Sequence, residues 1–117
     1  MSQFKQLTGA SFAKTLNEHD CVVVDFWAEW CQPCKNFEKV MEQAAAEYSQ
    51  VVFAQVDIDK EPELAADFQI VSVPFVMIVR YQTIVYAEAG LLSLGSLKEL
   101  IDGALKLTAE EIAKRKA

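Results

Sequence analysis

Two cysteines three residues apart mark the point of this 117-residue sequence at which side chains could do chemistry. Cys31-Gln32-Pro33-Cys34 follows the largely apolar residues 22–30, so the motif is predicted to lie where a strand ends and a helix begins. Residues three apart share one face of a helix, and its loose first turn can reduce the gap of about 5–6 Å between their Cβ atoms to the roughly 3.8 Å of a disulfide. Pro33 fits that turn because the amide hydrogen it lacks would have no intrahelical partner there. The spacing predicts a thiol pair that alternates between dithiol and disulfide.

The position of the motif also predicts different roles for the two thiols. Unpaired amide groups and the helix dipole stabilise negative charge at a helix start, so Cys31 is predicted to be the exposed nucleophilic thiolate, with Lys35 adding nearby positive charge. Cys31 would attack a substrate disulfide, and Cys34, one turn further in, would resolve the mixed disulfide. Cys34 must lose a proton for this step. Asp25, whose pKa should be raised by burial in the apolar run, is the candidate base.

Each feature also has a purely structural interpretation. A CxxC is half of a zinc site, but the sequence has only three cysteines and one histidine, His19, so no metal is predicted. The two cysteines could be unreactive, and Asp25 could be a hydrogen-bonded polar residue of the core. Trp27 is predicted to belong to the core, whereas Trp30 is predicted to border the site. Cys21, the third thiol, is predicted to be an inert, small apolar residue.

Composition limits the class of protein. Apolar residues make up 52% of the chain and the net charge is −6, with no basic run before the last few residues. One domain is predicted, and nucleic acid and anionic membranes are not expected as partners. No apolar stretch approaches the roughly 18 residues of a membrane span. Residues 1–6 lack the apolar segment of a secretory signal, so we expect a reducing, cytoplasmic location, where a CxxC points to catalysis rather than to a structural disulfide.

Hydrophobic periodicity predicts alternating strands and helices. The nearly unbroken apolar run at 21–27 is typical of a central strand covered on both faces, and residues 31–48 repeat apolar side chains at helical spacing. Further strands are predicted at 4–7, 51–58, 75–79 and 84–88, and further helices at 8–18, 62–68 and 94–105. Thr108 and Glu111 resemble a capping box, so residues 108–116 are predicted to form either a short extra helix or a frayed end.

The resulting order is βαβαβαββα. Strands connected through helices are expected to pair in parallel, and the last two strands to form an antiparallel hairpin. This predicts a three-layer α/β/α fold of the α/β class, with a central five-stranded mixed sheet. One domain is predicted at residues 1–107 and a tail at 108–117. The cysteines would lie at the C-terminal edge of the second strand, where α/β sheets commonly bind ligands.

Several segments resemble one known family. Residues 24–35, Val-Asp-Phe-Trp-Ala-Glu-Trp-Cys-Gln-Pro-Cys-Lys, resemble the active-site segment of thioredoxins. Residues 71–74, Val-Ser-Val-Pro, resemble the cis-proline loop that faces the cysteines in that family, and residues 56–59 and Gly90 also have similar counterparts. The resemblance covers roughly residues 3–106. It implies the thioredoxin fold and a protein-disulfide reductase without a cofactor, which maintains cell redox homeostasis and is re-reduced by a thioredoxin reductase.

The resemblance also implies a role for each matching residue. Cys31 would be the nucleophile, Cys34 the resolving thiol and Asp25 the buried proton-transfer acid. Pro74 would be cis rather than a plain strand-entry proline, and Val73 would offer backbone groups to an extended substrate. The expected substrate groove comprises Trp30, Gln32, Pro33, Val73, Pro74 and Gly90.

Four departures from the family pattern indicate a divergent member. Gln32 replaces the usual glycine between the cysteines, which could shift the redox potential in either direction. Gln55 stands where a lysine is common, and without that cation we expect a still higher pKa for Asp25. Phe75 follows the proline where a threonine is usual, and we expect it in the core. The turn at 80–83 lacks the usual Asn-Gly pair, which leaves its type open.

Three functions are compatible with these features. The first is the reduction of disulfides in protein substrates by a monomer. The second is a disulfide oxidase or isomerase of the same fold, which would need an oxidising compartment. The third is a client-binding or co-chaperone module in which the CxxC is incidental. The absence of a secretory signal favours the reductase over the oxidase.

Overall fold

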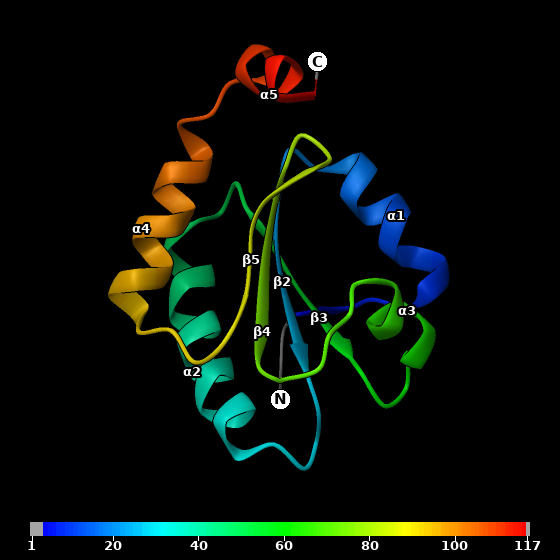
Figure 1. Ribbon diagram of the computed structural model, residues 1–117. Helices are drawn as coiled ribbons and strands as arrows, with labels where there is room; N and C mark the ends of the chain where they lie inside the picture. Colours follow the sequence, from blue (N-terminus) through cyan, green and yellow to red (C-terminus); the bar gives the residue numbers. More distant parts are fainter. Residues whose placement is uncertain (1–3, 117) are drawn as a thin grey trace.

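The chain folds into a mixed sheet with helices on both faces (Figure 1). The computed structural model of the protein describes residues 4–116. Within them the elements are, in chain order, β1 (Lys5–Gln6), α1 (Gly9–Glu18), β2 (Cys21–Trp27), α2 (Gln32–Glu47), β3 (Val52–Asp57), α3 (Pro62–Asp67), β4 (Phe75–Arg80), β5 (Thr83–Ala89), α4 (Leu94–Leu105) and α5 (Ala109–Lys116). The five strands lie in the order β1-β3-β2-β4-β5. The α/β/α architecture is therefore confirmed, with β2 as the central strand.

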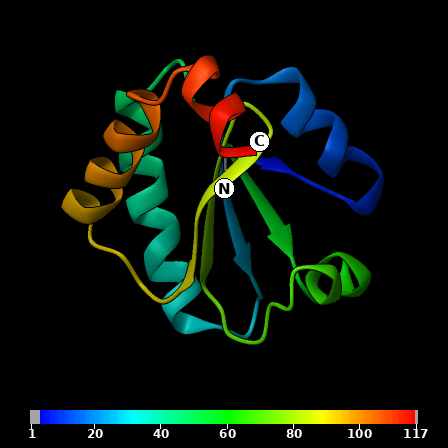
Figure 2. The same cartoon turned by 45° about the horizontal axis from the view of Figure 1, so that its top comes forward.

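Side-chain alternation along β2 divides its residues between two cores. Val22, Val24 and Phe26 pack with residues of α1 and α3, whereas Val23 packs beneath α2 and α4. The two helix pairs lie on opposite faces of the sheet in both views (Figures 1 and 2). Because successive side chains of a strand point to opposite faces, Asp25 faces the same side as Val23. The alternation thus directs a carboxyl group toward the helix that begins at the CxxC motif.

The direction of β4 differs from the expectation that strands connected through a helix pair in parallel. β1 and β2 pair in parallel with β3, but β4 pairs antiparallel with β2. The connection of residues 58–74, which includes the six-residue helix α3, does not cross the sheet but stays at the edge where β3 ends. Trp27 pairs with Asp57 at the end of β3, and Phe26 pairs with Phe75 at the start of β4. The chain therefore enters β4 from the edge that also holds the cysteines.

The β4–β5 turn has a conformation that usually calls for glycine or asparagine. Tyr81 and Gln82 have φ values of 49° and 61°, so both lie in the left-handed region of a type I′ turn. The side chain of Gln82 donates to the carbonyl of Leu16 at 3.3 Å, and two further contacts hold Tyr81. The Tyr81 amide donates to the carbonyl of Asp20 at 2.9 Å, and the guanidinium of Arg80 lies 4.3 Å from the centre of the Tyr81 ring. These contacts stabilise a type I′ turn whose two central residues are not the Asn-Gly pair that usually adopts this conformation.

Residues 109–116 form a helix at the end of the sheet opposite the CxxC motif (Figure 1). The hydroxyl of Thr108 accepts from the amide of Glu111, whose carboxylate accepts from the amide of Thr108, so the predicted capping box is present. Ile112 is 2% exposed, and the guanidinium of Arg80 donates to the carbonyl of Leu107 just before α5. The division of the chain into a domain at 1–107 and a tail at 108–117 stays a prediction.

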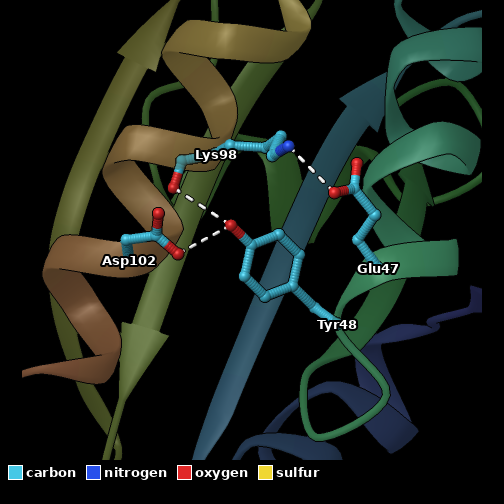
Figure 3. A network of polar contacts seen from close by, with 4 residues as sticks. All are labelled: Glu47, Tyr48, Lys98 and Asp102. Atoms are coloured by element: carbon cyan, nitrogen blue, oxygen red, sulfur yellow. Dashed lines mark hydrogen bonds and ion pairs between the residues drawn. The ribbon is translucent and has the colours of Figure 1, made fainter.

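A polar network joins the C-terminal end of α2 to α4 (Figure 3). The hydroxyl of Tyr48, which is 8% exposed, donates to Asp102 Oδ1 at 2.6 Å. This bond to a carboxylate raises the pKa of Tyr48 to about 12. Lys98 and Glu47 form a partly exposed ion pair beside it at 2.8 Å. Because α2 carries the two cysteines at its other end, this network helps to fix the position of the site.

Replacement of Tyr48 by phenylalanine should lower the free energy of unfolding by about 1–2 kcal/mol, because a partly buried hydrogen bond from a hydroxyl to a carboxylate is lost. Urea unfolding would measure the change. Lys98→Met is the matched control, since it breaks only an exposed ion pair and should have a smaller effect. Equal losses of stability in the two variants would contradict the expectation that the Tyr48–Asp102 hydrogen bond stabilises the fold more than the Lys98–Glu47 ion pair.

Candidate active site

The two cysteines are joined in a disulfide at the N-terminus of α2. Cys31 is the N-cap residue, Pro33 lies in the first turn, and the amide of Cys34 donates to Cys31 Sγ at 3.1 Å. A sulfur that receives an amide hydrogen at a helix start is placed where negative charge is stabilised. The local sequence thus produces the predicted strand-to-helix junction.

The expectation that Cys31 is the exposed thiol is not met. Cys31 is 4% exposed and Cys34 is 2% exposed, so both sulfurs are buried in the disulfide form. Ala28 and Val73 pack against the cysteines, and the carbonyl oxygen of Val73 lies 3.7 Å from Cys31 Sγ. A loop distant in sequence provides this cover, which is why the motif alone did not predict it.

The loop that covers Cys31 contains a cis peptide bond between Val73 and Pro74. The amide of Gly90 donates to the carbonyl of Pro74 at 2.8 Å, which places the end of β5 beside the loop. Gly90 has a φ of +124°, a conformation that side-chain-bearing residues rarely adopt. The three segments around Cys31, Pro74 and Gly90 therefore meet at one edge of the sheet.

Exposed side chains surround this edge. Gln32 and Pro33 are exposed, and Trp30 is 70% exposed while its indole nitrogen donates to Asp59 Oδ2 at 2.9 Å. Two exposed apolar residues next to the predicted groove residues were missed by the sequence analysis. They are Val71, which is 94% exposed, and Leu91, which is 54% exposed. Val71 is the first residue of the proline loop at 71–74 and Leu91 follows Gly90, and these positions could have identified them.

Asp25 is fully buried on the face of β2 that α2 covers. Burial raises the pKa of its carboxyl group to about 7, a hydrogen bond from Gln55 lowers it, and the charge of Glu38 raises it further. The direction of this shift was predicted. The sequence analysis expected Gln55 only to remove a cation, whereas Gln55 Nε2 donates to Asp25 Oδ2 at 3.2 Å. Asp25 Oδ1 has no hydrogen-bond partner among the described residues.

Strand register explains the neighbours of Asp25. In the parallel pairs, Gln55 lies opposite Asp25 and Gln6 lies opposite Gln55. Gln6 Nε2 donates to Gln55 Oε1 at 2.7 Å, and Gln55 Nε2 also donates to Glu38 Oε2 at 3.0 Å. The sequence analysis missed Gln6 and Glu38. Glu38 follows Cys34 by four residues, a helical spacing that could have identified it.

A hollow of about 680 Å³ lies beside this row of residues. Cys34, Gln55, Glu38 and Trp27 are among the residues that line it. Cys34 and the hydrogen-bond partner of Asp25 therefore border the same space.

The remaining candidates lie outside the site. Cys21 is 1% exposed at the far end of β2, and burial raises the pKa of its thiol. Phe75 packs edge-on against Phe26 with ring centres 5.9 Å apart, on the α1/α3 face. Among residues 4–116, no group of three or more His, Cys, Asp or Glu side chains could hold a metal ion. Within the same range, no helix is long and apolar enough to cross a membrane.

Comparison with known proteins identifies the family. A family model described as Thioredoxin matches residues 3–103. A thioredoxin 2 of Streptomyces coelicolor is 43% identical over 114 residues, which are 97% of this chain and 85% of that protein. A bifunctional thioredoxin reductase/thioredoxin of Mycobacterium leprae is 46% identical over 71 residues, which are 59% of this chain and 16% of that protein. The structure of a mutant thioredoxin from Halobacterium salinarum superposes with a TM-score of 0.82 at 28% identity, covering 92% of this chain and 95% of that one.

The chain belongs to the thioredoxin family. The family and the Cys31–Cys34 disulfide together identify a protein-disulfide oxidoreductase.

Asp25→Asn should raise the free energy of unfolding of the oxidised protein, relative to wild type, by about 4 kcal/mol more at pH 9 than at pH 4. The carboxyl pKa is raised from 3.8 to about 7 on folding, so the native state retains a proton that the unfolded state has lost between these values. Stability therefore falls as the pH rises through this range, and asparagine removes that loss. Urea unfolding of both proteins at the two pH values would measure the effect. A difference between wild type and variant that does not vary with pH would contradict the assigned shift.

Proposed function

We propose that this protein reduces disulfide bonds in other proteins, with Cys31 as the nucleophile, Cys34 as the resolving thiol and Asp25 as the proton acceptor. The observation that carries the proposal is the disulfide at the start of α2, where the Cys34 amide donates to Cys31 Sγ. This hydrogen bond and the helix dipole favour a thiolate at Cys31 in the reduced state.

The reaction has two exchange steps. The Cys31 thiolate attacks one sulfur of the substrate disulfide, and the other sulfur leaves as a thiolate with the electron pair of the broken bond. Cys34 then gives its proton to Asp25 and attacks Cys31 Sγ in the mixed disulfide. The second substrate sulfur leaves as a thiolate, and the Cys31–Cys34 disulfide forms. Two electrons have passed to the substrate, whose two thiolates become a dithiol by taking up protons from the solvent, and Asp25 loses its proton to the solvent.

The substrate groove is proposed to comprise Trp30, Gln32, Pro33, Val73, Pro74 and Gly90. The proximity of the Val73 carbonyl to Cys31 Sγ supports this assignment, because an extended segment whose sulfur is attacked there could pair with this backbone. Exposed apolar side chains at Trp30, Val71 and Leu91 would add contact area that does not depend on the sequence of the substrate.

A thioredoxin reductase is the proposed electron donor. The relative in Mycobacterium leprae, whose name joins a thioredoxin reductase to a thioredoxin, supports this partner. We further propose that the protein acts as a monomer in a reducing compartment, the cytoplasm. One chain supplies both thiols, the carboxyl group and the groove, so the reaction needs no second copy.

Cys31→Ser should abolish reduction of insulin disulfides, and Cys34→Ser should instead accumulate a mixed disulfide with the substrate, because attack proceeds but resolution does not. Non-reducing gels and intact mass would detect the trapped species. Cys21→Ala is the control, and it should retain activity because that thiol lies at the other end of β2. Full retention of the cellular role by Cys31→Ser would instead favour a client-binding module.

The reduction potential of the Cys31–Cys34 pair should be close to the roughly −270 mV that characterises thioredoxin itself. Equilibration against glutathione or dithiothreitol buffers, with tryptophan fluorescence as the signal, would measure it. A value near that of the oxidising enzymes, about −120 mV, would overturn the reductase proposal in favour of an oxidase or isomerase. Gln32→Gly is the variant that tests whether the residue between the cysteines sets the value.

A further inference from the structure

One amide group connects the buried carboxyl group to a second carboxylate nearer the surface. Gln55 Nε2 donates to Asp25 Oδ2 at 3.2 Å and to Glu38 Oε2 at 3.0 Å. Gln55 Oε1 is occupied by Nε2 of Gln6 at 2.7 Å. Since ionised carboxylates only accept hydrogen bonds, this is the orientation in which Gln55 can bond Asp25, Glu38 and Gln6 at the same time. The two hydrogens of one nitrogen therefore hold two acidic groups close together.

We infer that Glu38 is a positioning residue for the resolving step: through the shared amide of Gln55, its charge sets the pH range in which Asp25 can accept the proton of Cys34. This inference rests on the proposed role of Asp25. Glu38 is half-buried at the hollow that Cys34 and Gln55 also line, so its charge is only partly screened by solvent.

The physical basis is repulsion between like charges, one of which would have to form on the fully buried Asp25. An ionised Glu38 disfavours a second negative charge on Asp25, while the hydrogen bond from Gln55 favours it. The shared amide limits how far the two carboxyl groups can move apart. Loss of the Glu38 charge would therefore make Asp25 ionise at lower pH, whereas loss of the Gln55 amide would make it ionise at higher pH.

Unlike Glu38, the other charged groups around Asp25 are exposed or form hydrogen bonds elsewhere. Glu29 and Lys35 line the hollow but are exposed. Asp57 on β3 accepts the amides of residues 59 and 60 with its Oδ1. On β4 and β5, the facing residues are the apolar Val76 and, one strand further out, the exposed Glu88. Among the described residues, Glu38 is thus the carboxylate that shares a hydrogen-bond donor with Asp25.

Glu38→Gln tests the inference, because the new amide oxygen can still accept from Gln55 while the charge is lost. The Asp25 carboxyl titration, followed by carbon-13 NMR of the oxidised protein and assigned with Asp25→Asn, should shift down by about 0.5–1 pH unit. The acid limb of single-turnover insulin reduction at saturating substrate should shift by the same amount. At a pH below the midpoint, the rate should therefore rise by about 3–10-fold.

Glu42→Gln is the matched control, since it removes the same charge one turn further along α2 at an exposed position. It should leave both profiles unchanged. A second comparison uses Gln55→Met. In the Gln55→Met protein, Glu38 has lost the amide of Gln55 as a donor and can turn toward solvent. Adding Glu38→Gln to that protein should therefore shift the Asp25 titration less than Glu38→Gln shifts it in the wild type.

The outcomes separate this inference from the proposed function. Equal titrations of Asp25 in wild type and Glu38→Gln would overturn the coupling, even if Asp25→Asn still removes the acid limb and so supports the catalytic role. A shifted titration with an unshifted rate profile would overturn the role of Glu38 in resolution. If Asp25→Asn also left the rate profile unchanged, the proposed role of Asp25 would be wrong.

Discussion

The burial of one ionisable side chain in the middle of the sheet is the constraint to which the rest of the site responds. Asp25 lies in the central strand, where removal from water disfavours its charged form and raises its pKa. Parallel register brings Gln55 of β3 opposite it, and this amide supplies a hydrogen bond that partly offsets the penalty. Among the described residues the other oxygen has no hydrogen-bond partner, and burial leaves the carboxyl group with a pKa of about 7, so that it can gain or lose a proton near neutral pH. A group in that state can both accept and return a proton.

The start of α2 has the opposite electrostatic character. There an amide hydrogen and the helix dipole favour negative charge on Cys31, a few residues beyond a strand that disfavours it on Asp25. The two environments can lie so close because β2 passes directly into α2, and α2 is held against the sheet by its apolar face and by the Tyr48–Asp102 hydrogen bond. The same junction therefore favours an anionic sulfur and a neutral carboxyl group.

Local patterns were sufficient to predict most of the fold and the disulfide pair. The apolar run at β2, the helical periodicity of α2 and the cysteine spacing are all encoded within a few residues. The antiparallel direction of β4 depended on the path of residues 58–74, which stay at one edge of the sheet, and strand and helix patterns do not reveal that path. The cover over Cys31 and the link from Gln6 through Gln55 to Glu38 depended on contacts between distant segments. Sequence reasoning failed where register, rather than periodicity, decides which side chains meet.

The place of Cys21 limits how many redox states the molecule can adopt. Any two of the three cysteines could pair in an unfolded chain, but a disulfide requires Cα atoms less than about 7 Å apart. Cys21 begins β2 and the CxxC motif follows its end, so the strand separates them by roughly 20 Å. Within the folded chain, Cys31–Cys34 is therefore the one disulfide that can form, and oxidation converts the dithiol into a single disulfide rather than into a mixture of disulfide isomers.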